Sequence, residues 1–535
     1  MRISIVAPLV LVGLLLVGLL PASAAAAEPN FPPKDSRYHN YPEMVDEIMA
    51  AQAAFPDIVQ VFSIGQSYQG REIWAAKVSD NVATDEAEPE VLIDALHHAR
   101  EHLTTEQALY LLKVLTQDYA GDAAVKRLVD NREIYIIFAL NPDGMQYDLT
   151  GNPYRAWRKN RQPNVGSAAV GTDINRNYDY RWGCCRGSSG LPGSLTYRGR
   201  RPFSAPETRA MRDFVMSRVV DGRQQIRTHV TLHTNGQLIL WPYGHTKTAI
   251  PADMTRVDHA AFVALGRRMA QRNGYKAEQS SQLYITDGDQ IDWMYGRYRI
   301  FSFTWELYPT EHYRTSDFYP PDERIAAAVA RNRSALLYII DRADCPYSPI
   351  YMVKPLCGPL YDDFEINRGW VRDPDGTDTA TDGLWQVGDP APVSSLGPKQ
   401  LGTTTSGRAA LVTGLGALTV GDANDIDGGT TTIRSAPIAL PDPVGALAFS
   451  YYFAHRSTST ADDWFRVWVE AQDGTRTLVR EEIGRAVDDD ARWLGVRVSM
   501  TPWAGQTVRI VIGAADGAAN TWVEAAVDDI RIERP

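Results

Sequence analysis

Strand-like apolar runs alternate with helical periodicity over the first two thirds of the chain. Short apolar runs of this kind are typical of buried strands in a mixed or parallel sheet. An α/β domain is therefore expected over residues 28–345. The expected strands lie at 90–96, 134–140, 229–232, 238–241 and 300–305. The expected helices lie at 105–119, which has Leu109, Leu112 and Leu115 along one side, at 258–272 and at 325–342.

The pattern of hydrophobic and polar residues changes in the last third of the chain. Residues 346–361 hold four prolines and read as a linker, and Pro-rich segments of this kind are accessible to proteases. After it, short alternating runs are separated by Gly, Asp and Thr turns, as at 464–470, 507–512 and 521–532. Residues 362–535 therefore predict an antiparallel β-sandwich without helices.

The N-terminus has the pattern of an export signal. Arg2 precedes an apolar stretch over 3–20, Pro21 ends it, and Ala22-Ser23-Ala24 offers a cleavage site. The alternative is a membrane anchor, since the stretch is almost long enough to span a bilayer. The small residues after Pro21 favour cleavage, so residues 1–27 are predicted to be a signal peptide. We expect a secreted, extracellular protein with no membrane span after cleavage.

The composition limits the expected kinds of ligand and the expected role of the cysteines. The net charge of −11 argues against nucleic acid as a ligand. The four cysteines, at 184, 185, 345 and 357, favour disulfides in an exported protein. A local Cys345–Cys357 bond is plausible and an adjacent Cys184–Cys185 bond would strain the backbone, but the sequence leaves all three pairings open. No CxxC pair occurs, so a cysteine-based zinc site is not expected.

Candidate chemistry begins with three histidines at 97, 98 and 102, directly after a predicted strand. If a helix begins there, His98 and Glu101 lie three residues apart on one face and could bind a metal. The ordinary alternative is a surface histidine beside a salt-bridged glutamate. His233 and Glu306 each end another apolar strand, where a side chain can reach a cleft. A general base beside a metal would explain Glu306, and an arginine partner is the alternative.

Seven motifs, taken together, resemble one enzyme family. They are ALHHAREHLT around His98, NPDG at 141–144, WRKNRQP at 157–163, GTDINRNYDYRWGCC from Gly171, WPYG at 241–244, LYITDGDQIDW from Leu283 and FTWELYPT at 303–310. In order and spacing they resemble the zinc carboxypeptidases of the carboxypeptidase A type, and within them the bacterial carboxypeptidase T group. The resemblance covers residues 31–357 and implies a mixed eight-stranded sheet flanked by helices. It also implies one catalytic zinc ion and peptide substrates with a free C-terminal carboxylate. A monomer is expected.

The resemblance assigns a role to each matching residue. His98, Glu101 and His233 would bind zinc, Glu306 would be the general base and then the general acid, and Arg158 would stabilise the oxyanion. Asp173 would orient a zinc-binding histidine. The residues expected to contact substrate are Arg100, Asn175, Arg176 and Tyr284, with Asp289 and Ile291 in the pocket for the terminal side chain. Ile291 favours hydrophobic terminal residues, and Asp289 adds tolerance for Lys and Arg.

The resemblance also suggests structural calcium, since carboxylate oxygens suit this ion. The usual alternative is a solvated acidic turn. One expected site comprises Asp85, Glu86, Glu88, Glu90 and Glu133, and a second comprises Ser36, Tyr38 and Glu43.

The chain departs from the family pattern at two places. Asn235 stands where the family usually has an aromatic residue, and the enzyme-like segment begins just after the predicted signal, so no inhibitory propeptide is expected. Two other functions are compatible with the sequence. One is a cell-wall peptide hydrolase or amide deacylase on the same fold, and the other is an inert binding protein. The C-terminal sandwich resembles jelly-roll modules of exported bacterial peptidases, through DDFE at 362–365 and VDDI at 527–530. It would bind calcium, a surface polymer or substrate, or act as a spacer.

Overall fold

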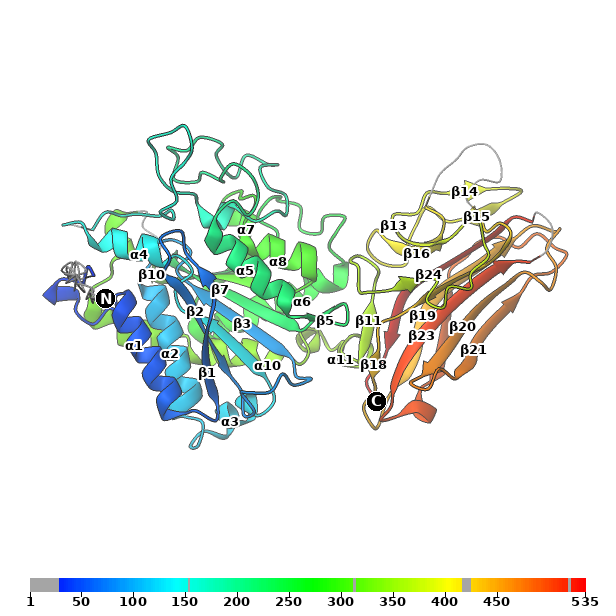
Figure 1. Ribbon diagram of the computed structural model, residues 1–535, viewed down its shortest axis with the longest axis horizontal. Coiled ribbons are helices and arrows are strands. Elements are labelled where there is room, and N and C mark those ends of the chain that lie inside the picture. Colours follow the sequence, from blue (N-terminus) through cyan, green and yellow to red (C-terminus); the bar gives the residue numbers. More distant parts are fainter. Residues whose placement is uncertain (1–27, 153, 311–313, 416–424, 518–520) are drawn as a thin grey trace, which may run out of the picture.

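The computed structural model describes residues 28–152, 154–310, 314–415, 425–517 and 521–535. An α/β region and a β-sandwich lie side by side (Figure 1). The predicted signal peptide lies outside the described residues. Among the helices that are described, none combines the length and the apolar character needed to cross a bilayer.

A mixed eight-stranded sheet forms the centre of the α/β region, which confirms the predicted fold class. Its strand order is β1-β2-β4-β3-β7-β10-β8-β9. The central strands β4, β3, β7 and β10 are parallel, and every residue of β3 is buried, as its apolar sequence requires. The strands are β1 (Val59–Gln66), β2 (Glu72–Val78), β3 (Glu90–Ala95), β4 (Glu133–Ile137), β7 (Ile226–Gly236), β8 (Leu238–Trp241), β9 (Lys276–Gln279) and β10 (Phe301–Thr310).

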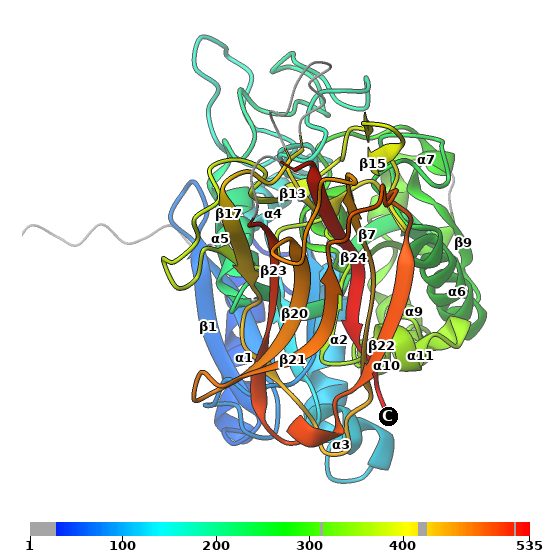
Figure 2. The same ribbon diagram turned by 90° about the vertical axis from the view of Figure 1, so that its right-hand side faces the viewer.

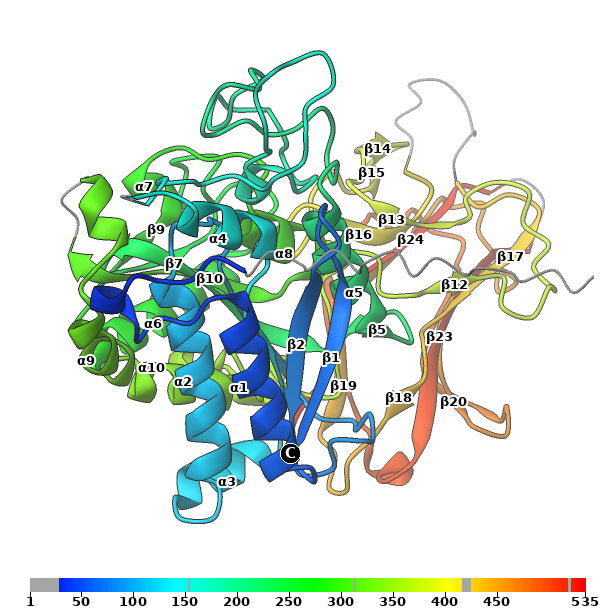
Figure 3. The same ribbon diagram turned by 60° about the vertical axis from the view of Figure 1, so that its left-hand side comes forward.

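Helices pack along this sheet (Figure 3). Helix α1 begins at a capping box formed by Asn40 and Glu43, and α6 ends at Gly274, which adopts a left-handed conformation. The predicted helix at 325–342 is two helices, α9 and α10. The helices are α1 (Tyr41–Ala54), α2 (Leu103–Gln117), α3 (Ala123–Val129), α4 (Pro142–Leu149), α5 (Pro206–Ser217), α6 (Arg256–Asn273), α7 (Ser280–Leu283), α8 (Gln290–Tyr298), α9 (Ile325–Ala330), α10 (Arg333–Arg342) and α11 (Val353–Leu356). Short 3-10 turns include η2 (Ile174–Arg176) and η3 (Thr315–Phe318).

The C-terminal region is a sandwich of two antiparallel sheets (Figure 2). Alternate residues of β20, such as Phe465, Val467 and Val469, are buried between the sheets, as the alternating pattern predicts. Within the described part of the sandwich, the expectation of no helix was wrong for the 3-10 turn at Thr501–Trp503. One sheet contains β11 (Leu360–Asp362), β13 (Trp385–Gly388), β16 (Ala410–Thr413), β19 (Ala446–His455), β22 (Leu494–Ser499) and β24 (Val523–Ile532). The other contains β12 (Val371–Arg372), β17 (Gly429–Arg434), β18 (Ile438–Ala439), β20 (Trp464–Ala471), β21 (Arg476–Ile483) and β23 (Thr507–Asp516).

The segment that reads as a linker is folded and joins the two regions closely. Cys345 and Cys357 form a disulfide that encloses α11, and β11 begins three residues after Cys357. The short strands β5 (Val219–Val220) and β6 (Arg223–Gln224) are joined by a turn that presses on the sandwich. A Cβ added to Gly222 in this turn would lie 2.7 Å from the carbonyl oxygen of Arg368. The two regions therefore share a tightly fitted junction.

Candidate active site

A turn after the buried strand β3 presents the first two candidate metal ligands. The amide of Glu101 donates to the carbonyl oxygen of His98 at 3.0 Å, so the two side chains stand on the same side of the turn. Helix α2 begins only at Leu103. The helical spacing predicted for this pair was therefore wrong, although the separation of three residues brings the side chains together as expected.

Two neighbouring strands supply His233 and Glu306. The two residues are direct partners in the parallel pairing of β7 with β10, so their side chains point from the same face of the sheet. Both strands continue past these positions, to Gly236 and Thr310. The prediction that His233 and Glu306 end their strands was wrong, because the apolar runs stop before the strands do.

The imidazoles of His98 and His233 converge on the Glu101 carboxylate. Their Nδ1 atoms lie 2.8 and 3.0 Å from the two carboxylate oxygens and 3.1 Å from each other. All three side chains are buried. Burial lowers the pKa of His233 to about 4, which favours the neutral imidazole that binds metals. Two imidazole nitrogens and one carboxylate form a donor set that fits a catalytic zinc ion.

Asp173 links the metal-ligand cluster to Arg158. Its carboxylate lies 3.2 Å from Nε2 of His98, the nitrogen opposite the converging Nδ1, and accepts from Nε of Arg158 at 3.0 Å. Burial alone would raise the pKa of Asp173, but Arg158 and His98 hold it well below the usual range. The buried carboxylate thus orients the imidazole and fixes the guanidinium beside the cleft.

Two adjoining cavities share His98, Tyr284 and Glu306. The wider one, of about 310 Å³, is also lined by Arg158 and by Arg100, whose guanidinium stacks 3.9 Å over the ring of Phe318. The smaller one, of about 30 Å³, lies beside Asn175, Arg176 and Ile291. Every predicted zinc-binding, catalytic and substrate-binding residue lines one of these cavities. Asp173 lies behind them.

The smaller cavity has a cationic wall. The Arg176 guanidinium is buried and is held by the carbonyl oxygens of Asn175 and Gly187, at 2.6 and 3.1 Å. The ring of Tyr284, half-exposed in the loop after α7, lies 6.0 Å from this guanidinium. Asn175 accepts from the amide of Gln290 through Oδ1, which orients its side chain.

The rest of the smaller cavity combines apolar and carboxyl groups. Buried Ile291 lies close to Asp289, which caps α8 by accepting from the amide of Asp292 at 3.0 Å. Burial, and then the nearby charge of Asp292, raise the pKa of Asp289 to about 7. Leu240 and Thr304 also line the cavity and were missed from the sequence. Each lies inside an apolar strand, where nothing in the sequence distinguishes a pocket residue from a core residue.

The neighbouring residues Cys184 and Cys185 form a disulfide, in a loop that contacts Asp287 next to the pocket residue Thr286. The amides of Cys185 and Gly187 both donate to the Asp287 carboxylate, at 3.1 and 2.8 Å. Of the three connectivities left open by the sequence, the structure has the one with two local bonds, Cys184–Cys185 and Cys345–Cys357.

A buried network under the metal-ligand cluster was not predicted. Asp94 on β3 lies 2.5 Å from Nε2 of His229 and accepts from the Thr231 hydroxyl at 2.8 Å. The Thr231 hydroxyl in turn lies 3.4 Å from Nε2 of His233. Because Asp94 sits inside an apolar strand, the only sequence signal for it is the presence of a charge in that strand.

The first predicted calcium cluster separates into two groups. Asp85, Glu90 and Glu133 form one, and their charges are compensated by two cations of the chain. Arg218 contacts Asp85 at 2.7 Å and Glu90 through Nε at 3.0 Å, and Lys77 contacts Glu133 at 2.7 Å. Glu86 and Glu88 form the other group with Asp80, which was missed. Burial, and then the charges of Glu86 and Asp80, raise the pKa of Glu88 to about 7.

The residues of the second predicted calcium site have separate partners. The Tyr38 hydroxyl donates to the carbonyl oxygen of Pro320 at 2.8 Å, and the Glu43 carboxylate accepts from the amide of Asn40 at 3.0 Å. Ser36 is exposed just before them. This site stays a prediction.

Known proteins resemble the α/β region. The family model described as zinc carboxypeptidase matches residues 44–335. A zinc carboxypeptidase of Saccharothrix mutabilis subsp. capreolus is 48% identical over 316 residues, 59% of this chain and 72% of that protein. Carboxypeptidase A1 of Sus scrofa is 33% identical over 307 residues, 57% of this chain and 70% of that protein.

Two solved structures share the fold. Carboxypeptidase A of Helicoverpa armigera matches with a TM-score of 0.50 and 26% identity, over 58% of this chain and 74% of that one. Bovine thrombin-activatable fibrinolysis inhibitor, in complex with tick carboxypeptidase inhibitor, matches with the same score and identity, over 57% of this chain and 97% of that one. The chain belongs to the zinc carboxypeptidase family. It is a hydrolase of the metallopeptidase class, whose substrates are peptides and whose catalytic metal is zinc.

Proposed function

We propose that this enzyme removes single residues from the C-terminus of peptides, with Glu306 as the proton-transfer group. The observation that best supports this proposal is the position of Arg176 relative to the metal ligands. His98, Glu101 and His233 converge beside Glu306, and Arg176 lines the adjoining cavity. A metal cluster alone would suit many hydrolases. A buried guanidinium next to it favours a substrate with a free terminal carboxylate.

Arg176 and Asn175 would bind that carboxylate. A guanidinium presents two parallel N–H groups to a carboxylate, and here backbone carbonyls already hold it in position. Tyr284 stands half-exposed at the mouth of both cavities, so it is placed to close over the terminal residue. The terminal side chain would then enter the cavity lined by Ile291 and Asp289.

The chemistry would proceed by attack of water on the last peptide bond. Zinc held by His98, Glu101 and His233 would lower the pKa of water and polarise the carbonyl. Glu306 takes the proton of the attacking water as the new C–O bond forms, and it returns the proton to the amine nitrogen as the C–N bond breaks. Arg158 lines the same cavity and would face the oxyanion that develops between these steps.

The lining of the smaller cavity supports a hydrophobic preference with tolerance for basic residues. Ile291 and Leu240 offer apolar contact to a side chain such as Leu or Phe. Asp289 adds a carboxyl group that would attract Lys or Arg when ionised. Asn235, in place of the usual aromatic, lines the wider cavity and would contact the substrate backbone there.

The first test is hydrolysis of an N-blocked dipeptide ending in Phe or Leu. We expect release of the terminal amino acid, loss of activity with a zinc chelator, and no activity on the C-terminally amidated substrate. Efficient cleavage of the amidated substrate would contradict the exopeptidase proposal and favour an amidase or endopeptidase. Full zinc occupancy without turnover of any peptide would instead support the inert binding protein.

We also propose secretion and a structural calcium ion. Secretion is supported by the N-terminal pattern and by two disulfides, which persist outside the cytoplasm. For calcium, Asp80, Glu86 and Glu88 are the favoured ligands, because no described Lys or Arg forms an ion pair with them. Export of a tagged full-length chain tests the first proposal. A rise in the unfolding temperature with calcium, absent in Glu86→Gln, tests the second.

A further inference from the structure

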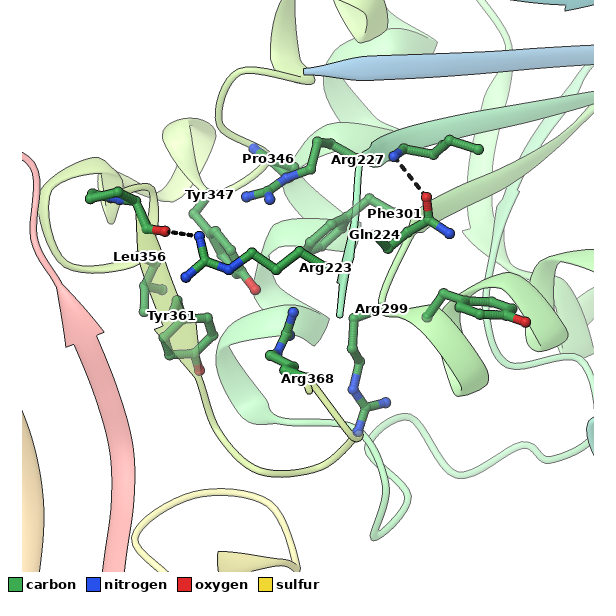
Figure 4. Close-up of a pocket in the computed structure, with 14 residues that line it drawn as sticks. Arg223, Gln224, Arg227, Arg299, Phe301, Pro346, Tyr347, Leu356, Tyr361 and Arg368 are labelled. Carbon is green, nitrogen blue, oxygen red and sulfur yellow. Dashed lines mark hydrogen bonds between the residues drawn. The ribbon is translucent and has the colours of Figure 1, made fainter. Parts of the chain in front are cut away.

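Three arginines converge at the junction of the two domains (Figure 4). Arg223 comes from β6, Arg227 from the start of β7, and Arg368 from the sandwich, just after β11. They line one cavity of about 80 Å³ around Tyr347. Arg227 and His233 lie six residues apart on β7, so roughly 20 Å separates this cavity from the zinc-ligand cluster.

Among the described residues, the arginines that line this cavity outnumber the carboxylates that pair with them. A fourth lining arginine, Arg299, pairs with Glu365 at 3.6 Å. Arg368 has a carboxylate neighbour, Asp362, at 3.4 Å. Arg223 donates to a neutral group, the carbonyl oxygen of Pro359, at 2.5 Å. Among the described residues, no carboxylate forms an ion pair with Arg223 or Arg227. Arg223 is half-buried and Arg227 is exposed at the edge of the cavity. Guanidinium groups gathered in one hollow without carboxylate partners create a positive potential that favours the binding of an anion.

Deprotonation does not remove the excess charge. Burial, and then the charges of Arg368 and Arg227, lower the pKa of Arg223 to about 10. A guanidinium group with such a pKa still carries its proton at neutral pH. An anion is therefore the remaining source of compensation. It can enter from solvent, because Arg227 also lines an open groove of about 520 Å³ beside the cavity.

We propose that this cavity binds a tetrahedral oxyanion of the inorganic phosphate or sulfate class. Arg223 and Arg227 would hold it from the catalytic domain, and Arg368 would hold it from the sandwich. Guanidinium groups bind such anions through pairs of parallel hydrogen bonds. The bound anion would thus join the two domains, in addition to the close contact at Gly222.

The test is a calorimetric titration of the zinc-loaded full chain with inorganic phosphate, at an ionic strength kept constant with chloride. Phosphate can also meet the arginines of the active site, so the informative quantity is the binding event that junction variants remove. We expect Arg227→Met and Arg368→Met each to weaken that event about tenfold or more. Arg297→Met, which removes an exposed arginine paired with Asp179, is the control and should titrate like the unchanged protein.

Titrations of both junction variants that match the unchanged protein would overturn the proposal. Crystals of the unchanged chain give a second test that needs no variant. Grown without phosphate or sulfate and then soaked with arsenate, they should show an anomalous peak among Arg223, Arg227 and Arg368. The absence of a peak there, with arsenate visible elsewhere in the crystal, would also overturn it.

Discussion

Two clusters of titratable side chains lie at opposite ends of β3, and they balance their charges differently. At the carboxyl end, the Glu101 carboxylate is flanked by two imidazoles, and Arg158 is directed to Asp173 instead. At the amino end, Glu90 is contacted directly by Arg218. Both clusters have the residue types and spacing of metal sites.

The difference shows how a catalytic metal site can be distinguished from a cluster of acidic residues. Where the chain supplies Arg218 and Lys77, the carboxylates are already compensated and a cation gains little. Where the described residues supply only imidazoles, the carboxylate and the ring nitrogens are left for a metal ion. The position of lysine and arginine side chains therefore discriminates between the two clusters better than the acidic residues do.

The largest expected effect concerns Glu306. Replacing it with glutamine keeps the size of the side chain but removes the proton acceptor. We expect Glu306→Gln to lower kcat by about 10²–10⁴-fold, with one zinc per chain retained. Steady-state kinetics and metal analysis of the same sample measure both quantities. Glu90→Gln, at the other end of β3, is the control and should keep kcat. A variant at Glu306 with near-normal kcat would assign the base to another residue.

The second prediction concerns a variant that removes a positive charge at the amino end of β3. Arg218→Met would leave Glu90 buried without its cation, at a cost of about 3–5 kcal/mol in unfolding free energy. Urea unfolding measures this loss. Calcium should restore part of it, because the freed carboxylates become available to a cation. Arg212→Met, which breaks a pair between a partly exposed arginine and the exposed Asp213, should change stability by less than about 0.5 kcal/mol.

The same variant should respond to pH in a defined direction. Burial raises the pKa of Glu90 to about 7 in the folded protein, above its unfolded value, and Arg218 opposes this rise. A carboxyl with a raised pKa stabilises the fold at low pH, and this contribution is lost as pH rises through the folded pKa. The loss caused by Arg218→Met should therefore be larger at pH of about 8 than at about 5. An equal loss at both values would place the effect of Arg218 in packing instead.

The sequence predicted the strands of the sheet well, because buried parallel strands are continuous apolar runs. It predicted less well the contacts between side chains that are far apart in the sequence and come together only in the folded chain. Asp80 joins Glu86 and Glu88 only through the loop that follows β2, and Arg218 reaches Glu90 across more than a hundred residues of chain. Leu240 lines the pocket only because β8 pairs antiparallel to β10. The resemblance supplied the site residues that periodicity alone could not.

The third prediction concerns recognition of the terminal carboxylate. Arg176→Lys keeps the charge but loses the two parallel N–H donors, so kcat/KM should fall about 10–100-fold, mainly through KM. Kinetics on N-blocked dipeptides separate the two parameters. Arg181→Lys, at an exposed arginine in the neighbouring loop, is the control. A fall in kcat alone would instead place Arg176 at the reacting bond.

The smallest expected effect is a change of selectivity with pH. The pKa of Asp289 is raised to about 7, so its carboxyl is mostly neutral in mildly acidic solution and ionised in mildly basic solution. The ionised form attracts a terminal Lys, whereas a terminal Leu is indifferent to it. The ratio of kcat/KM for Lys over Leu should therefore rise several-fold, up to about tenfold, between about pH 6 and about pH 8.

Taking a ratio of two substrates removes the pH dependence that they share, including that of Glu306 and the metal ligands. Asp292 also faces Asp289, but it is held by His245 at 2.8 Å. Asp289→Asn keeps the acceptor for the Asp292 amide and removes the titration, so its ratio should stay flat at the low value. A ratio that still rises with pH in this variant would assign the selectivity to another acid, and would remove Asp289 from the determinants of the pocket.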